Sequence, residues 1–365
     1  MNKNIIIVGS TGKLGTKLLK YTYSNNIKIN AITCYSNNTK LLNQKSKYKI
    51  KKGFMLSDDY HKLQFIKFLK KKTAIIYFLD YGAYSLIYLD IFLKFNSNSI
   101  IAIANKEMII AGGKLLFKKI NLSKNYFIPL DSEHFSLKNS LSYNSNINKI
   151  YITASGGPFF FSKKSNFTNV KLNEVLAHPK WKMGKNNSID SSNFINKILE
   201  IFELSYIFNI DLSKIDFLVS KNAYVHSIIM YNDGITTLNC YKNDMLIPLI
   251  YPLTYIKKIN PNIANNQYLL NQNNFSLINN FDKRFIFFKY HDFMKKLNHI
   301  NQLNLLLLNN YAHSLYLSDK LKYKDIIPFI MNKLFNLQNK YKRKKFFSFK
   351  QILNHIEDFK KNYIV

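Results

Sequence analysis

Two carboxylates and an imidazole stand close together in the segment IPLDSEHFSL, residues 128–137. Asp131 and Glu133 are separated by one residue, so in an extended backbone both side chains point to the same side of the chain. Carboxylate oxygens that converge in this way suit Mg²⁺ or Mn²⁺. The alternative is structural, because an acid directly before the predicted helix HFSLKNSL would cap that helix at its N-terminus.

A further acid for such a site is available in SSNFINKILEIFELSYIF, residues 191–208, whose apolar periodicity predicts a helix. Asn196, Lys197, Glu200 and Glu203 interrupt the apolar sequence, and helical spacing gathers Asn196, Glu200 and Glu203 on one face. Because the rest of the helix is apolar, we expect it to be buried, with its polar face toward a cavity or a partner. The alternative is an amphipathic helix with an ordinary solvated face. Spacing alone does not show whether this helix meets Asp131.

A glycine-rich turn, GSTGKLG at residues 9–15, follows the apolar run NIIIV and precedes the helical stretch TKLLKYTYS. Gly9, Gly12 and Gly15 allow the backbone to approach a phosphate, and the helix N-terminus offers unpaired N–H groups. The pattern favours binding of a dinucleotide pyrophosphate. The alternative is a tight structural turn, since the spacing differs from the commoner GxGxxG.

The loop after the second predicted strand, TCYSNNTK at residues 33–40, contains no acid. NAD enzymes usually place an acid there to bind the ribose hydroxyls. Ser36, Asn37, Asn38 and Lys40 could instead donate hydrogen bonds to a 2′-phosphate, which favours NADP(H) over NAD(H). A polar loop without a ligand is the alternative, because loops throughout this chain are rich in Asn and Lys.

Three further features could contribute to a site. Ser155 lies beside two glycines in ASGGPFF, which predicts a nest of N–H and hydroxyl donors for an oxyanion or a phosphate. The segment HPKWKMG, residues 178–184, contains the single tryptophan, Trp181, and has the composition of a mobile lid. His226 lies in a predicted strand, where a histidine packed in the core is the more common finding.

The elements that must position these residues fall into an α/β fold. Strands alternating with helices to about residue 130 predict a doubly wound, Rossmann-like dinucleotide-binding domain with a parallel sheet. An α+β catalytic domain at residues 131–255 follows, with a hairpin signalled by the NDG sequence at 232–234. Residues 256–283 are predicted to be a linker, and residues 284–365 a small helical domain.

Composition limits the class of protein. The 365 residues include 53 Lys and Arg but only 21 Asp and Glu, a formal net charge of +32. This charge is spread along the chain without a nucleic-acid-binding motif, so we expect no nucleic-acid partner. The cysteines, Cys34 and Cys240, indicate neither a disulfide framework nor a zinc site. A strand that begins at residue 4 and the absence of a long apolar run predict a cytoplasmic protein with no membrane partner.

Six segments, taken in chain order, resemble the 1-deoxy-D-xylulose 5-phosphate reductoisomerase family. They are GSTGKLG, ANKE (104–107), PLDSEH (129–134), SGGPF (155–159), HPKWKMG and IDSSNFINKILE (189–200). The resemblance extends over residues 4–235 and implies a three-domain, V-shaped homodimer. It implies NADPH and a divalent cation, Mg²⁺ or Mn²⁺ with Co²⁺ as a further option. The implied reaction rearranges and reduces 1-deoxy-D-xylulose 5-phosphate, a small phosphorylated sugar, to 2-C-methyl-D-erythritol 4-phosphate in the non-mevalonate isoprenoid pathway.

The resemblance also implies residue roles by matching position. The metal ligands are Asp131, Glu133 and Glu200. The catalytic group comprises Lys106, Glu133, His134, His178 and His226. The cofactor-binding group comprises Gly9, Ser10, Thr11, Gly12, Lys13, Leu14, Asn37, Asn38, Asn105, Glu107 and Gly184. The substrate-binding group comprises Lys106, Ser132, Glu133, Ser155, His178, Trp181, Ser191, Asn196, Lys197 and Glu200. Trp181 and Met183 belong to the flexible lid, and Glu203 supports the site.

The chain departs from the family pattern at two places. Lys13 replaces a serine of the glycine loop, and Ser220-Lys221-Asn222 replaces an HPQ sequence ahead of a pocket histidine. Three other functions stay open on the sequence alone: an NADPH-binding protein of this fold without turnover, a metal-independent NADP-dependent dehydrogenase, and a basic scaffold for nucleic acid. Metal dependence would distinguish a reductoisomerase from the metal-independent dehydrogenase. Salt-sensitive retention of DNA or RNA would favour the scaffold.

Overall fold

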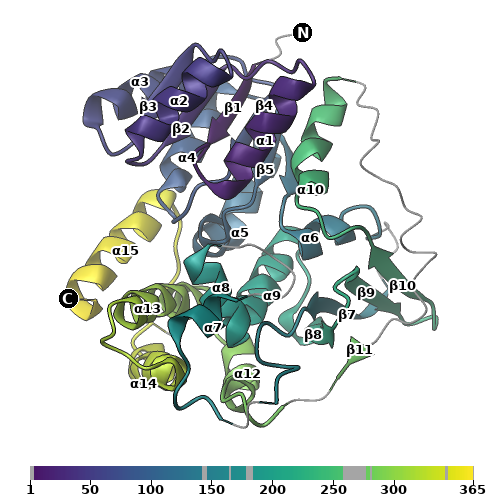
Figure 1. Cartoon of the computed structure of the whole chain (residues 1–365). Coiled ribbons are helices and arrows are strands. Elements are labelled where there is room, and N and C mark those ends of the chain that lie inside the picture. Colours follow the sequence, from purple (N-terminus) through teal and green to yellow (C-terminus); the bar gives the residue numbers. More distant parts are fainter. Residues whose placement is uncertain are drawn as a thin grey trace. The chain divides into compact units, whose positions relative to one another are not determined.

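The computed structural model describes residues 4–141, 146–163, 166–177, 184–257, 277–279, 282–341 and 344–364 (Figure 1). The chain divides into two compact units. The first contains Met1–Lys138 and Asp244–Asn265, and the second contains Asn139–Asn243 and Asn266–Val365. The division into three domains and a linker stays a prediction.

The first unit is built on a six-stranded parallel sheet with the order β3-β2-β1-β4-β5-β6. Its strands are β1 (Ile5–Val8), β2 (Ala31–Cys34), β3 (Lys52–Met55), β4 (Ile75–Phe78), β5 (Ile100–Ile103) and β6 (Tyr126–Pro129). All residues of β1, β2, β4 and β5 are buried, as expected where helices cover both faces of a parallel sheet. The predicted doubly wound sheet is therefore confirmed. The strand order reverses between β1 and β4, where folds of this type bind ligands.

Helices connect these strands. They are α1 (Lys13–Ser24), α2 (Asn38–Lys47), α3 (Asp59–Leu69), α4 (Ser85–Phe95), α5 (Lys106–Leu122) and the short α6 (Ser132–Leu137). The side chains of Asn37, Asp58 and Asn105 accept hydrogen bonds from the first turns of α2, α3 and α5, which explains where those helices begin. Helices α3, α4 and α5 pack side by side in that order.

The segment that returns to the first unit contains α10 (Leu246–Ile250) and the 3₁₀ helix η2 (Tyr251–Tyr255). Its Leu249, Ile250 and Leu253 are buried in the same apolar core as β1 and β4. The Tyr77 hydroxyl on β4 donates to the carbonyl of Leu249 at 3.1 Å. These contacts explain why residues after 243 fold with the first unit.

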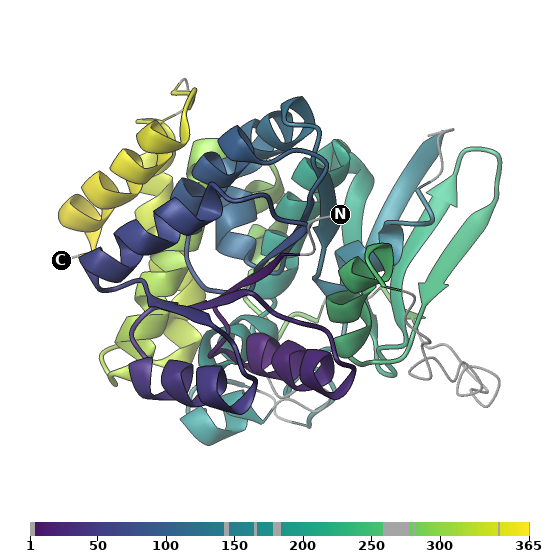
Figure 2. The same ribbon diagram turned by 90° about the horizontal axis from the view of Figure 1, so that it is seen from above.

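The second unit contains a five-stranded mixed sheet with the order β10-β9-β7-β8-β11. Its strands are β7 (Ile147–Ala154), β8 (Ile215–Ser220), β9 (Val225–Tyr231), β10 (Thr236–Cys240) and β11 (Leu277–Ile278). Strands β7 and β8 are parallel, whereas β7 and β9, β9 and β10, and β8 and β11 are antiparallel. The hairpin β9–β10, green in Figure 2, turns at Gly234 with a φ of 87°, as the NDG sequence predicts.

Helices of the second unit pack against this sheet and against one another. They are α7 (Leu172–Leu176), α8 (Lys185–Ser192), α9 (Ile195–Phe208), α12 (Phe287–Lys295), α13 (His299–Leu317), α14 (Ile326–Gln338) and α15 (Phe349–Tyr363), with the 3₁₀ helices η1 (Leu212–Lys214) and η3 (Tyr323–Asp325). Helix α13 packs against α8, α14 and α15, and α12 packs against α9. The expected C-terminal helices are thus present. No helix among the described residues has the length and apolarity needed to span a membrane.

Candidate active site

The glycine-rich turn joins β1 to α1 at the point where the strand order of the first sheet reverses. Gly9 has a φ of 83°, and a Cβ on it would lie 2.5 Å from the backbone N of Asp80, just after β4. A Cβ on Gly15 would lie 2.5 Å from the Cα of Ser10. Both glycines are therefore required by close backbone packing. No described side chain caps α1 at Gly12, so the positive end of its dipole is available to an anion.

Two side chains of α2 stabilise this turn. The Lys40 ammonium donates to the carbonyl of Thr11 at 2.7 Å. The Gln44 amide donates to the carbonyl of Ser10 at 2.9 Å and accepts from the Ser10 hydroxyl at 2.7 Å. Asn37 caps α2 by accepting from the backbone N–H of Lys40. Lys40 and Asn37, predicted from sequence as donors to a 2′-phosphate, thus also have structural roles, and Gln44 was not predicted.

A largely buried polar cluster lies at the carboxyl ends of β4 and β5, beside the glycine turn. The Asp80 carboxylate accepts hydrogen bonds from the Ser85 hydroxyl and, at 3.2 Å, from the Asn105 amide. Burial raises the pKa of Asp80 to about 6, against the lowering effect of these hydrogen bonds. Asn105 also caps α5, at whose start Lys106 and Glu107 are buried. Asp80 could not be singled out from the sequence, because one acid after a predicted strand forms no recognisable pattern.

Asp131 and Glu133 lie at the start of α6. One carboxylate oxygen of Asp131 lies within 4.8 Å of one of Glu133. Asp131 also accepts from the backbone N–H of Glu133 at 3.1 Å, so it caps α6 while its second oxygen stays available to a ligand. The ring of His134, fully buried, has its Nδ1 at 3.6 Å from an Asp131 oxygen. Asp131 can therefore cap α6 and still point a carboxylate oxygen toward Glu133.

In the second unit, the loop after β7 is packed against the end of α8. Gly156 and Gly157 have φ values of 83° and 59°. A Cβ on Gly157 would lie 2.6 Å from the carbonyl oxygen of Ser191. The backbone N–H of Gly157 donates to the Ser155 hydroxyl at 3.4 Å. The structure thus brings the predicted Ser155 nest and Ser191 together.

Helix α9 carries the polar face that its spacing predicts. Glu200, 2% exposed, accepts hydrogen bonds from the amide of Asn196 and, at 2.5 Å, from the ammonium of Lys197. Glu203, three residues further along, is 1% exposed. A carboxylate this deeply buried needs charged and polar donors to remain ionised, and the neighbouring turn of the same helix provides both. The prediction of a buried helix is confirmed, and a solvated polar face is excluded.

Comparisons with known proteins agree with these features. The family model described as 1-deoxy-D-xylulose 5-phosphate reductoisomerase C-terminal domain matches residues 127–208. The 1-deoxy-D-xylulose 5-phosphate reductoisomerase of Pelagibacter ubique (strain HTCC1062) is 33% identical over 355 residues, which cover 89% of each chain. That of Clostridium novyi (strain NT) is 30% identical, covering 96% of each. The chain belongs to this family. The resemblance seen in the sequence is therefore confirmed.

Solved structures of the 1-deoxy-D-xylulose 5-phosphate reductoisomerase family share the fold. A crystal structure of DOX-P reductoisomerase in complex with NADPH, fosmidomycin and magnesium matches with a TM-score of 0.86 and 23% identity, covering 99% of this chain and 97% of that one. The Zymomonas mobilis enzyme in complex with NADPH matches with a TM-score of 0.80 and 20% identity, covering 98% and 97%.

Several residues with roles implied by the resemblance lie outside these clusters. His178, Trp181 and Met183 fall outside the described residues. Gly184 is the N-cap residue of α8, and no atom of the described residues outside its chain neighbours lies within 4 Å of where its Cβ would be. His226 is 2% exposed, and its ring stacks on Tyr241 with the centroids 3.9 Å apart. His226 is thus packed in the core, the more common finding for a histidine in a strand.

The departure at 220–222 also has a place in the second unit. Ser220 pairs with Leu277 of β11, and the Lys221 ammonium lies 5.6 Å from the ring centroid of Phe161. The carbonyl of Asn222 accepts from Asn243. The replacement sequence therefore makes ordered contacts of its own.

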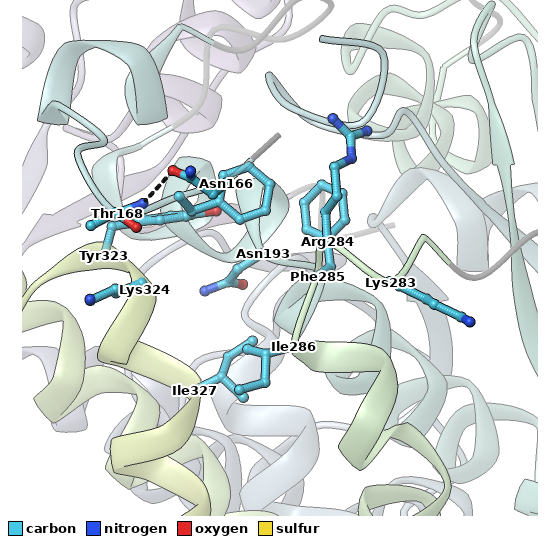
Figure 3. A pocket seen from close by; sticks show the side chains of 11 residues that line it. Asn166, Thr168, Asn193, Lys283, Arg284, Phe285, Ile286, Tyr323, Lys324 and Ile327 are labelled. Carbon is cyan, nitrogen blue, oxygen red and sulfur yellow. Dashed lines mark hydrogen bonds between the residues drawn. The ribbon is translucent and has the colours of Figure 1, made fainter. Parts of the chain in front are cut away.

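A cavity of about 330 Å³ lies in the second unit, lined by residues 166–168, 283–286, 323, 324 and 327 and by Asn193 (Figure 3). It contains none of the predicted site residues. Figure 3 shows Arg284 directed away from the cavity, where its guanidinium pairs with Asp282 and donates to the carbonyl of Phe160.

Proposed function

We propose that this chain is an NADPH- and divalent-metal-dependent 1-deoxy-D-xylulose 5-phosphate reductoisomerase that forms 2-C-methyl-D-erythritol 4-phosphate. Membership of the family over nearly the whole chain supports the reaction. The single structural observation that carries the proposal is the polar face of α9. There Asn196 and Lys197 hold the buried Glu200 carboxylate within a helix whose other residues are mostly apolar. Burying charged and polar groups costs free energy unless they are paired, and a bound cation and phosphate would supply that pairing.

We assign the phosphate group of the substrate to Ser155, Ser191, Asn196 and Lys197. All four belong to the second unit, where Gly157 brings the Ser155 loop against Ser191. Hydroxyl, amide and ammonium donors match the acceptor oxygens of a phosphate. The ammonium of Lys197, a residue that is 7% exposed, would add charge in a site from which water is largely excluded.

The divalent cation is assigned to Asp131, Glu133 and Glu200. Three carboxylates suit Mg²⁺ or Mn²⁺, because hard cations prefer oxygen ligands. The proximity of the Asp131 and Glu133 oxygens supports these two residues as ligands. Glu200 is supported as the third ligand because Asn196 and Lys197 orient its carboxylate. We further propose that Ser132, His134 and Glu203 hold these carboxylates in place.

NADPH is assigned to the glycine turn and the adjacent strand ends. Residues 9–14 at the N-terminus of α1 would bind the pyrophosphate, with Lys13 adding a positive charge. Asn37 and Asn38, in a loop without acids, would accommodate the 2′-phosphate. Asn105, Lys106 and Glu107, at the start of α5, would lie toward the nicotinamide.

The residues then act by holding reactants in position. When bound, the cation supplies Lewis acidity at the substrate oxygens, and NADPH supplies the hydride. A carbon–carbon bond breaks and a new one forms, so both fragments must stay in the site between the two steps. The phosphate donors on α8 and α9 would anchor one fragment, and Trp181 and Met183 of the proposed lid would exclude water from the other. This confinement makes recombination effectively intramolecular.

We also propose that the protein acts as a homodimer in the cytoplasm. The test of the reaction follows NADPH absorbance with 1-deoxy-D-xylulose 5-phosphate and Mg²⁺, then with chelator, and identifies the product. Metal-dependent oxidation that yields 2-C-methyl-D-erythritol 4-phosphate supports the proposal. Oxidation that persists in chelator would favour a simple dehydrogenase. A folded protein that binds NADPH without turnover in Mg²⁺ or Mn²⁺ would be the non-catalytic alternative.

A further inference from the structure

A buried carboxylate lies directly beside one of the proposed phosphate donors. Asp190 precedes Ser191 in the last turn of α8 and is 4% exposed. The C-terminal end of a helix carries the negative end of its dipole, so an acid there does not stabilise the helix. Burial adds a second cost unless the charge is paired. Asp190 therefore requires an explanation other than local helix stability.

Two side chains of α13 meet this carboxylate. The Asn309 amide donates to Oδ1 of Asp190 at 2.7 Å, and Nε2 of His313 lies 3.0 Å from the same oxygen. Asn309 and His313 are one helical turn apart on α13 and are 0% and 1% exposed. Both contacts lie within the second unit. The C-terminal helices thus reach the segment that carries Ser191.

The same turn of α8 is held at two further points. The Tyr323 hydroxyl of η3 donates to the carbonyl of Ser192 at 2.9 Å. Gly157 lies against the carbonyl of Ser191. The Ser155 loop therefore contacts Ser191 directly. The C-terminal helices fix it indirectly, by holding its neighbours Asp190 and Ser192. Substrate recognition by a hydroxyl depends on its position to within a fraction of an ångström.

We propose that Asp190, Asn309 and His313 are positioning residues that hold Ser191 in place for the phosphate group of the substrate. This inference rests on the proposed function, in which Ser191 binds that phosphate. It gives the C-terminal helices a specific part in substrate binding: α13 supports the phosphate site through one buried carboxylate.

The test exchanges the two partners. Asn309→Asp places a second carboxylate against Asp190, and the double variant Asp190→Asn/Asn309→Asp restores one carboxylate and one amide. Asn310→Asp, at the neighbouring half-buried position of α13, is the control for the added charge. His313→Gln is a milder variant should Asn309→Asp fail to fold. The measurements are the affinity for inorganic phosphate, KM and kcat for 1-deoxy-D-xylulose 5-phosphate, and the affinity for NADPH.

We expect Asn309→Asp and His313→Gln to weaken phosphate binding and raise KM by about tenfold, with kcat and NADPH affinity nearly unchanged. The double variant should recover most of the loss, and Asn310→Asp should resemble the wild type. Phosphate affinity that is unchanged in both single variants, or a double variant without recovery, would overturn the positioning role alone. Wild-type protein that binds neither phosphate nor substrate would overturn the proposed function, and this inference with it.

Discussion

Gly157 lies so close to Ser191 that no side chain fits between them: a Cβ on the glycine would be 2.6 Å from the carbonyl oxygen of Ser191. The contact joins the loop after β7 to the end of α8. It brings the loop that carries Ser155 against the backbone of Ser191, although the two residues are distant in the sequence. The proposed phosphate site depends on this approach.

Gly157→Ala should therefore displace the Ser155 loop. Because Gly157 also has a φ of 59°, the substitution adds backbone strain, and we expect a loss of about 1–3 kcal/mol in the free energy of unfolding. The control is Gly234→Ala, where φ is 87° but no atom lies within 4 Å of the new Cβ. Urea unfolding measures stability, and calorimetry measures phosphate affinity. Equal phosphate affinity in the two variants would show that the contact with Ser191 is unimportant.

The glycine turn offers a second matched pair. A Cβ on Gly15 would collide with Ser10, whereas a Cβ on Gly12 would meet its nearest atom, the carbonyl oxygen of Gly9, at 3.5 Å. Gly15→Ala should lower both stability, by about 1–3 kcal/mol, and NADPH affinity. Gly12→Ala should keep stability and lose NADPH affinity alone, because its methyl group would occupy the approach of the pyrophosphate. The quenching of protein fluorescence by NADPH measures affinity, and unaltered binding in Gly12→Ala would argue against the assigned pyrophosphate position.

Asp80 makes stability depend on pH. Its pKa of about 6 in the folded protein lies above the ordinary value of 3.8 for an aspartate, so its favourable contribution to stability is complete below pH 4 and is lost as pH rises through 6. Asp80→Asn should therefore stabilise the protein at pH 7.5, by at most about 3 kcal/mol, about half as much at pH 5, and hardly at all below pH 4. Asp59→Asn, which changes an exposed acid of the same unit, is the control. A stability difference between wild type and Asp80→Asn that does not change with pH would show that the titration of Asp80 is not its cause.

Patterns within single segments allowed much of the fold and part of the site to be predicted. The apolar runs and the glycine turn predicted the parallel sheet, and helical spacing predicted that Asn196 and Glu200 share a face. Contacts between segments that are distant along the chain produce no such local pattern in the sequence. Asp80, Gln44 and the pairing of Asp190 with Asn309 depend on which strand ends and helices the fold brings together. Each residue alone resembles an ordinary polar residue of this Asn- and Lys-rich chain.

In the proposed function, Asp131, Glu133 and Glu200 bind one divalent cation. Binding of Mn²⁺, followed by electron paramagnetic resonance, tests it without requiring turnover. Glu133→Gln, Glu200→Gln and the double variant are compared with wild type, and Glu357→Gln on α15 is the exposed control.

Ligands of one ion act together, so we expect each single variant to lose at least about tenfold in Mn²⁺ affinity and the double variant to lose much less than the sum of the two effects in free energy. The control should bind like the wild type. Wild-type Mn²⁺ affinity in Glu200→Gln, or strictly additive losses from two independent sites, would contradict the claim.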